Sequence, residues 1–248
     1  MRMFRNMLDC AMEMDRELLQ SGMTVPVKSY QNKKLEGDDQ ITKELMGVAF
    51  TISKPLVKRE EAIEYLFGED AKRIVEYCKV EFQDRVSPEI LNPGNSYKIR
   101  LDLWQKFMVD DVNNIKKFDY TYNERYNRFN QLNNAIDALK NDIHTRQSIV
   151  QVYHPDLDSG KHGGITRIPC SMSYQFLIRN NQTHIIYYMR SNDMLSHYLI
   201  DLYLTAELMK YVTDKLKDTY EELQYGSLTY FAGSLHAYHF NLKDRVIF

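Results

Sequence analysis

Apolar residues recur at helical spacing in several stretches of the chain. Residues 1–21 are amphipathic, and residues 58–79 carry two apolar groups on either side of Gly68. Apolar side chains three or four positions apart share a helix face, whereas glycine tends to interrupt a helix. The pattern therefore predicts a helix at 1–21 and two helices divided at Gly68. It predicts further helices at 201–223 and at 123–142, the latter with one apolar face: Phe129, Leu132, Ile136 and Leu139.

Other stretches alternate or are extended, and turn residues bound them. Residues 173–191 predict a hairpin around an Asn-rich turn, and Pro155 ends a predicted strand at 146–155. Further extended runs lie at 24–30 and 46–52, and residues 225–242 predict a last strand followed by a turn and more chain. Residues 83–120 predict an irregular polar surface segment, and residues 156–164 predict a loop.

The order of these elements is interleaved but lacks a regular βαβ rhythm. It predicts an α+β fold, with a mixed twisted β-sheet and helices packed on one face. A chain of 248 residues can form one large domain, so we expect a single domain over 1–248.

Composition excludes several classes of partner. The net charge is only −2, so we expect neither nucleic-acid binding nor attraction to an anionic membrane. No apolar run approaches the roughly 18 residues of a membrane span, and the N-terminus lacks the apolar core of a signal peptide. Three cysteines without metal-ligand spacing predict a reducing compartment, the cytoplasm, and no metal site.

Four polar clusters are candidates for chemistry. They are Cys170 after Pro169, the Arg190–Asp193 segment, Asp201 and His236. Each alone has an ordinary structural explanation: a small buried thiol, a helix-capping turn, a carboxylate at a helix start and a core histidine. Together they suggest more, because an arginine beside a hydroxyl can clamp phosphate, and a thiol near a fixed cation can act as a nucleophile.

The same motifs, in the same order, resemble the thymidylate synthase superfamily. The matching segments are PCSMSYQF from Pro169, RSND from Arg190, the helix from about residue 201, and GSLHAY ending at Tyr238. The resemblance implies the corresponding fold, a homodimer paired through its sheets, and 5,10-methylenetetrahydrofolate as the cofactor. Cys170 would attack carbon 6 of a pyrimidine nucleoside monophosphate, which makes carbon 5 nucleophilic.

The resemblance also implies roles for other residues. Arg190 would favour the thiolate and hold phosphate, and Glu61, in EAIEYLFGE, would organise water and proton transfers around the ring and contact folate. His236 and Tyr238 would bind the sugar hydroxyl. Phosphate, base or folate contacts are implied for a further set: Gln175, Ser191, Asn192 and Asp193.

Fainter matches and departures concern phosphate and folate. LDLW places Trp104 at a folate contact, and Arg146 would reach the partner subunit's phosphate, although Gln147 replaces the family's second arginine. The family's Arg-Thr-Gly-Thr phosphate loop is missing, and Lys28 lies about where it should be. The family's C-terminal closing segment is not recognisable.

Asp201 is the most informative departure, because it stands where the synthases have the asparagine that recognises uracil. A carboxylate can accept a hydrogen bond from the amino group of cytosine and share a proton with N3. Together with MRSND and GSLH, it resembles phage deoxycytidylate hydroxymethylases, in which water rather than hydride completes the reaction. We therefore predict hydroxymethylation of dCMP.

Several alternatives remain open at this point. One is a thymidylate synthase or a dUMP hydroxymethylase, and another is a CMP hydroxymethylase. From a different class, the chain could be a non-catalytic nucleotide-binding relative. Asp201 could also be explained wholly as a helix N-cap.

Overall fold

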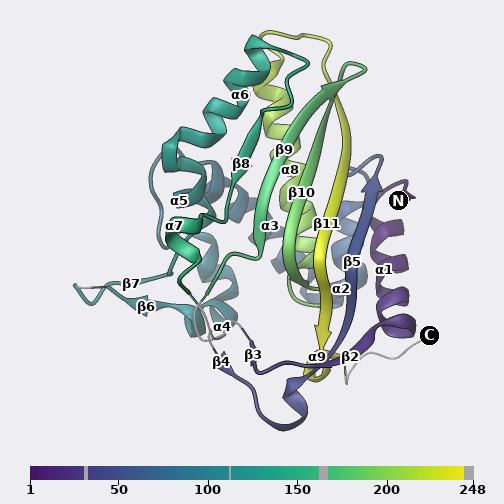
Figure 1. Cartoon of the computed structure of the whole chain (residues 1–248), viewed down its shortest axis with the longest axis vertical. Coiled ribbons are helices and arrows are strands. Elements are labelled where there is room, and N and C mark those ends of the chain that lie inside the picture. The colour runs from purple at the N-terminus through teal and green to yellow at the C-terminus, as the bar shows by residue number, and fades with distance from the viewer. Residues whose placement is uncertain (31–32, 112, 162–166, 243–248) are drawn as a thin grey trace.

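A seven-stranded mixed sheet forms the centre of the computed structural model, which describes residues 1–30, 33–111, 113–161 and 167–242 (Figure 1). Its strand order is β1-β5-β11-β10-β9-β8, and β2 also pairs with β5. The pairs β1–β5 and β10–β11 are parallel and the others antiparallel. The strand bounds are β1 (Arg2–Phe4), β2 (Met23–Pro26), β5 (Ile41–Ile52), β8 (Ile149–Gln151), β9 (Ser171–Arg179), β10 (Gln182–Asp193) and β11 (Gln224–Tyr238).

Helices cover one face of this sheet, which confirms the predicted α+β class. The longest, α8, is largely buried and packs on β10 and β11, while α1 packs on β5 and α6 on β8 and β9. Gly68 has φ +54° and separates α2 from α3, as its position predicted. The helix bounds are α1 (Met7–Ser21), α2 (Arg59–Phe67), α3 (Ala71–Val86), α4 (Leu101–Trp104), α5 (Tyr122–Asn127), α6 (Gln131–Asn141), α7 (Pro155–Asp158), α8 (Tyr198–Leu216) and α9 (His239–Leu242).

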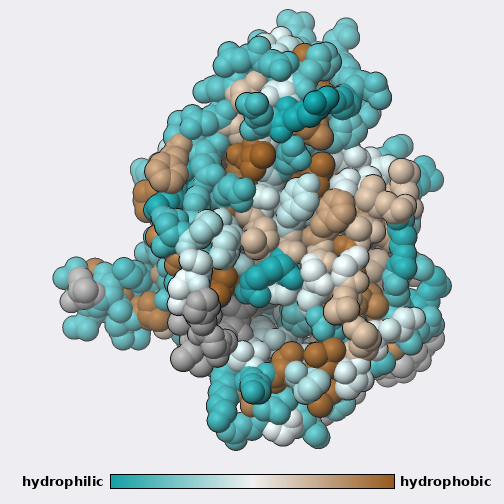
Figure 2. Space-filling model, viewed as in Figure 1, coloured by the Kyte–Doolittle hydropathy of each residue, from teal (hydrophilic) through white to brown (hydrophobic). Residues whose placement is uncertain are grey.

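The predicted hairpin is formed by β9 and β10. Asn180 and Asn181 make its turn with φ +50° and +56°, a left-handed conformation that asparagine tolerates better than most residues. In β10, alternate side chains such as Ile185 and Tyr187 are buried against the helices. The opposite face of the sheet is not covered by these helices, and Figure 2 shows apolar side chains among the polar ones there.

The segment 83–120 is largely exposed or half-buried, as its polarity predicted, but it contains regular structure. It contains short helical turns η3 (Ser96–Arg100) and η4 (Gln105–Phe107) and the small hairpin of β6 (Val109–Asp110) and β7 (Lys116–Lys117). Phe107, Phe118 and Tyr120 are nevertheless buried. Aromatic side chains spaced irregularly in a polar stretch fold inward here, and no helical or strand period marks them.

One local prediction was wrong. The helix predicted at 123–142 breaks where Phe129 and Asn130 take φ +59° and +52°, so Phe129 is 72% exposed instead of lying on the apolar face. The predicted last strand, β11, runs through GSLHAY to Tyr238, and the chain then turns into the short helix α9. Part of the predicted loop, residues 162–164, lies outside the described residues.

The remaining described elements are short: β3 (Ser29–Tyr30), β4 (Lys33–Lys34), η1 (Gly37–Gln40), η2 (Gly68–Asp70) and η5 (Arg128–Asn130). None of the helices in the described part of the chain has the length and hydrophobicity that a membrane span requires.

Candidate active site

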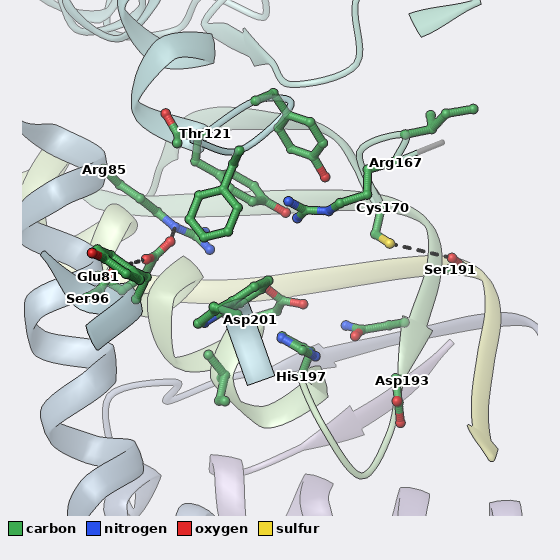
Figure 3. Close-up of a pocket in the computed structure, with 18 of the residues that line it drawn as sticks. Glu81, Arg85, Ser96, Thr121, Arg167, Cys170, Ser191, Asp193, His197 and Asp201 are labelled. Carbon is green, nitrogen blue, oxygen red and sulfur yellow. Dashed lines mark hydrogen bonds and ion pairs between the residues drawn. The ribbon is translucent and has the colours of Figure 1, made fainter. Parts of the chain in front are cut away.

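A cavity of about 480 Å³ lies where β9 begins and β10 and β11 end. The first turn of α8 and the buried face of α3 form other parts of its wall, and the aromatic side chains of the 83–120 segment complete it. Several side chains from elements far apart in the sequence point toward one another in this space (Figure 3). The cavity therefore brings together groups that no local pattern connects.

Cys170 lies at the edge of the cavity, immediately before β9. Its Sγ atom is 3.7 Å from Nη2 of Arg190 and 3.8 Å from Oγ of Ser191 (Figure 3). Arg190 also donates hydrogen bonds to the carbonyl oxygens of Pro169, at 2.9 Å, and Ile168, at 2.8 Å. The guanidinium group thus fixes the loop that carries the thiol and provides a positive charge beside the sulfur.

Asp201 lies in the first turn of α8, and its side chain faces the same cavity. Burial raises the pKa of its carboxyl to about 7, with a further contribution from Glu81. Arg85 and a hydrogen bond with Asn192 oppose the rise. Near neutral pH both protonation states of Asp201 are therefore accessible.

An ion pair on α3 borders Asp201, and no sequence motif marks it. Arg85 Nε donates to Glu81 Oε1 at 2.8 Å, and Ser96 Oγ donates to Glu81 Oε2 at 2.6 Å (Figure 3). The Arg85 guanidinium also lies 3.7 Å from the centre of the Tyr122 ring. The available signal was an acid and a base four residues apart, but Glu81 lies beyond the helix predicted at 58–79 and Arg85 falls in the segment predicted to be irregular. Such spacing is also more typical of a solvent-exposed pair on a helix.

Glu61, by contrast, does not reach the cavity. It lies on α2 with its side chain exposed, and the cavity wall contains Glu81 instead. The motif containing Glu61 and the segment containing Glu81 are both helical and acidic. Only the packing of α3 against α8 distinguishes which carboxylate faces the cavity.

Asp193, His236 and Tyr238 line the cavity at the ends of β10 and β11. Asp193 Oδ1 accepts a hydrogen bond from the Leu195 amide at 3.1 Å, while Oδ2 is buried without a partner among the described residues. Burial raises the pKa of Asp193, and the nearby His236 opposes this rise. His236 Nδ1 is 3.2 Å from Ser234 Oγ, and burial lowers the pKa of this imidazole.

Trp104 lines an aromatic part of the cavity together with two residues that the sequence did not single out. The Arg167 guanidinium lies 5.6 Å from the Trp104 ring centre and 5.0 Å from that of Tyr120. The His197 ring lies 5.4 Å from Trp104, in an edge-on arrangement. Arginine stacked among aromatic rings is favourable, and this stacking holds the cation in the wall.

Three other predicted site residues lie outside the cavity wall. Gln175 is in the middle of β9, and its Nε2 donates to the carbonyl oxygen of the exposed Arg146 at 2.9 Å. Lys28 is outside as well, although its neighbours Ser29 and Tyr30 line the cavity. Asn192 and Ser191 do line it, and the Asn192 side chain is buried.

Among the described residues, no group of three or more histidine, cysteine, aspartate or glutamate side chains is arranged to hold an ion. The three cysteines differ in solvent exposure: Cys10 and Cys78 are buried thiols, and Cys170 is partly accessible.

Comparison with known proteins gives a family match over most of the chain. Residues 76–245 match the family model described as thymidylate synthase. A protein from Methanococcoides burtonii named "Putative thymidylate synthase" is 28% identical over 163 residues, which cover 64% of this chain and 70% of that protein. The deoxycytidylate 5-hydroxymethyltransferase of Enterobacteria phage T4 is 33% identical over 110 residues, 41% of this chain and 40% of that enzyme.

The chain is also similar to a second phage enzyme and to a solved structure. The deoxyuridylate hydroxymethyltransferase of Bacillus phage SP01 is 31% identical over 98 residues, 40% of this chain and 22% of that enzyme. The solved structure of thermostable thymidylate synthase A from Bacillus subtilis superposes with a TM-score of 0.58 at 12% identity, covering 94% of this chain and 80% of that one. At that identity the match supports the fold alone. The chain spans less than half the length of both phage enzymes.

Proposed function

Since this chain belongs to the thymidylate synthase family, we propose that it hydroxymethylates carbon 5 of a cytosine nucleotide, with dCMP as its substrate. The observation that carries the proposal is that the buried carboxyl of Asp201 faces the same cavity as the thiol of Cys170. The first group can select the base, and the second can activate it.

Base selection follows from the hydrogen-bonding pattern of the pyrimidine edge. Cytosine presents an amino donor at carbon 4 and an acceptor at N3, whereas uracil presents the reverse. Asp201, with a pKa of about 7, can accept from the amino group and share a proton with N3. Uracil would leave buried polar groups unpaired, which an enclosed site penalises strongly.

Carbon activation is assigned to Cys170 and α3. The sulfur adds to carbon 6 of the ring, and the Arg190 guanidinium stabilises its negative charge before attack. Glu81 takes the acid–base role that the family resemblance implies for Glu61, because Glu81 lies beside Asp201 in the cavity wall. Arg85 and Ser96 hold the Glu81 carboxylate in place.

Nucleotide binding is assigned to groups on both sides of the cavity. Arg190 and Ser191 offer a guanidinium and a hydroxyl to the phosphate. His236 and Tyr238 contact the sugar hydroxyl. Arg146 and Gln175 do not line the cavity of the chain that carries them. We therefore assign Arg146 to the phosphate site of a partner subunit.

The aromatic part of the cavity fits 5,10-methylenetetrahydrofolate. Trp104 offers a ring face, and the unpartnered Oδ2 of Asp193 offers an acceptor for an N–H donor of the pterin. When bound, the folate supplies a one-carbon unit to carbon 5 of the nucleotide. The reaction is assigned to the cytoplasm, because three free cysteines suit a reducing compartment.

A direct assay tests this proposal. The protein is incubated with methylenetetrahydrofolate and with dCMP, CMP or dUMP, each tritiated at carbon 5, and both tritium release and product mass are measured. We expect release from dCMP and a hydroxymethyl product. A methyl product, or release from dUMP alone, would refute the proposal in favour of a synthase-type reaction.

Two variants connect the assay to the cavity. Cys170→Ala should abolish tritium release while dCMP still binds in calorimetry. Asp201→Asn should move the preference from dCMP toward dUMP by at least about tenfold, since one donor–acceptor reversal at a base edge is worth about 1–3 kcal/mol. An unchanged preference would remove Asp201 from base selection.

A further inference from the structure

His197 has an unpartnered ring nitrogen in the cavity wall, between the groups assigned to the base and to folate. It immediately precedes α8, and its carbonyl accepts a hydrogen bond from the Asp201 amide at 2.8 Å. Its own amide donates to the Asp193 carbonyl at 3.0 Å. The backbone therefore fixes His197 between the two carboxylates (Figure 3).

The Nε2 atom of His197 is buried but has no hydrogen-bond partner among the residues that the structure describes. Buried polar atoms are nearly always paired with protein, water or ligand. Because His197 lines the cavity, the missing partner would be a molecule that enters it. The ring packs edge-on against Trp104 at 5.4 Å, which limits the directions in which it can turn.

The surroundings keep this imidazole neutral. Burial lowers the pKa of His197 well below its usual range. Nearby guanidinium groups lower it further: Arg100, Arg167 and Arg85. A neutral imidazole can accept a proton at Nε2, which a charged one cannot.

We propose that His197 is a catalytic residue that activates the water in the hydroxymethylation, a role that rests on the function proposed above. Its Nε2 atom takes a proton from the water that adds to the one-carbon group of the nucleotide. A synthase completes its reaction with a hydride and has to keep water away, so a base placed here would decide the outcome in favour of hydration.

The step is balanced without an oxidant or reductant. The nucleotide at this stage is bonded through carbon 6 to Sγ of Cys170 and carries a methylene on carbon 5. The water oxygen bonds to the methylene carbon, its proton passes to Nε2 of His197, and the electron pair of the exocyclic double bond moves into the ring. That pair forms the double bond between carbons 5 and 6 as the carbon–sulfur bond breaks and the thiolate leaves. The imidazolium then returns its proton to solvent.

Other titratable groups in the wall are already engaged or already assigned, Asp201 to the base edge and Asp193 Oδ2 to the pterin. Both carboxylate oxygens of Glu81 are engaged, one by Arg85 and one by Ser96. Nδ1 of His236 is close to Ser234 Oγ, and the ring lies beside Asp193. Only His197 combines a neutral ring with a buried, unpartnered nitrogen among the described histidines that line the cavity.

The reverse of this step gives a test that needs no folate. The protein is incubated with 5-hydroxymethyl-dCMP in water enriched in the heavy oxygen isotope, and incorporation into the hydroxymethyl group is followed by mass spectrometry. A parallel reaction measures deuterium exchange at carbon 5 of dCMP, which requires Cys170 but no water addition. We expect wild-type protein to catalyse both exchanges.

His197→Gln should slow oxygen exchange by at least about 100-fold, the usual contribution of a general base, and leave deuterium exchange within a few-fold of wild type. Cys170→Ala should lose both. His184→Gln is the matched control, because His184 lies near the opposite end of β10 and its Nδ1 pairs with Ser227; it should retain both. His197→Ala, with and without added imidazole, gives an independent variant, and imidazole should restore its oxygen exchange.

The outcomes separate this role from the proposed function. Oxygen exchange at the wild-type rate in both His197 variants would overturn the assignment while leaving the enzyme a hydroxymethylase. Parallel loss of both exchanges, without rescue by imidazole, would also overturn it, because His197 would then support the site in general. Wild-type protein that exchanges deuterium but not oxygen would refute the hydration step, and one that exchanges neither would refute the proposed function as well.

Discussion

Asp201 shows at the scale of one residue how a site can cost stability. Its carboxyl is taken out of water at the start of α8, and burial is the main reason that its pKa rises to about 7. An unfolded chain would ionise this group near its ordinary value of 3.8. Ionisation of Asp201 therefore lowers the free energy of unfolding as pH rises from about 4 to 7, and above pH 7 this destabilisation no longer increases.

Asp201→Asn should accordingly stabilise the ligand-free protein at pH 8 but not at pH 4. The pKa difference sets an upper limit of about 4 kcal/mol on the gain, and a few degrees in Tm is the expected size for a chain of this length. Thermal melts of both proteins across this pH range test it. Equal stabilisation at every pH would mean that the carboxylate charge is not the cause.

At the scale of elements, two consecutive helices offer competing glutamates. The helix α2 presents Glu61 to solvent, whereas α3 packs against α8 and presents Glu81 to the cavity. A sequence motif depends on the letters around a glutamate, but the acid–base role depends on its position beside the base. The packing of α3 therefore favours Glu81 for the proposed acid–base role.

A matched pair of variants tests whether Glu81 or Glu61 has the acid–base role. Glu81→Gln should lower kcat by about 100-fold or more while retaining the shape of the side chain, because a placed acid–base group usually contributes that much. Glu61→Gln, one helix earlier, should stay within a few-fold of wild type in the tritium-release assay. The opposite pattern would return the role to Glu61.

At the scale of the whole molecule, the sheet face opposite the helices carries exposed apolar side chains. Tyr188 on β10 and Phe231 on β11 stack with ring centres 5.5 Å apart and are 36% and 37% exposed. Ile149 on β8 adds further exposed apolar surface, because it pairs with Gln175, which in turn pairs with Ile186 on the Tyr188 face. The family resemblance implies a homodimer paired through its sheets, and an exposed aromatic pair on an uncovered sheet face suits such an interface. We therefore propose that two copies of the chain pair through this face, where Figure 2 shows apolar side chains among polar ones.

Phe231→Glu should weaken this dimer, since a charge would be buried without a partner. Sedimentation velocity should show a shift toward monomer, whereas Phe129→Glu, at an exposed position between α5 and α6, should not change the state. A wild-type protein that is monomeric and fully active would contradict the proposal. Mixing Cys170→Ala with Arg146→Ala subunits should restore activity if Arg146 acts across the interface.

The sequence by itself determined features that depend on local order. The hairpin at 173–191, the helix break at Gly68 and the α+β class follow from periodicity and from the backbone preferences of asparagine and glycine. Cys170, Arg190 and Asp201 could be recognised because four motifs occur in one order along the chain. The order and spacing of these motifs can be read from the sequence without knowing how the chain packs.

Only the tertiary structure decided which of the remaining side chains share a cavity. Glu81, Arg167 and His197 carry no distinctive local pattern, and they converge because α3, the loop before β9 and the start of α8 meet at one end of the sheet. The unpartnered nitrogen of His197 is likewise a property of its surroundings. Burial and pairing are created by contacts between distant segments, so a linear pattern does not contain them.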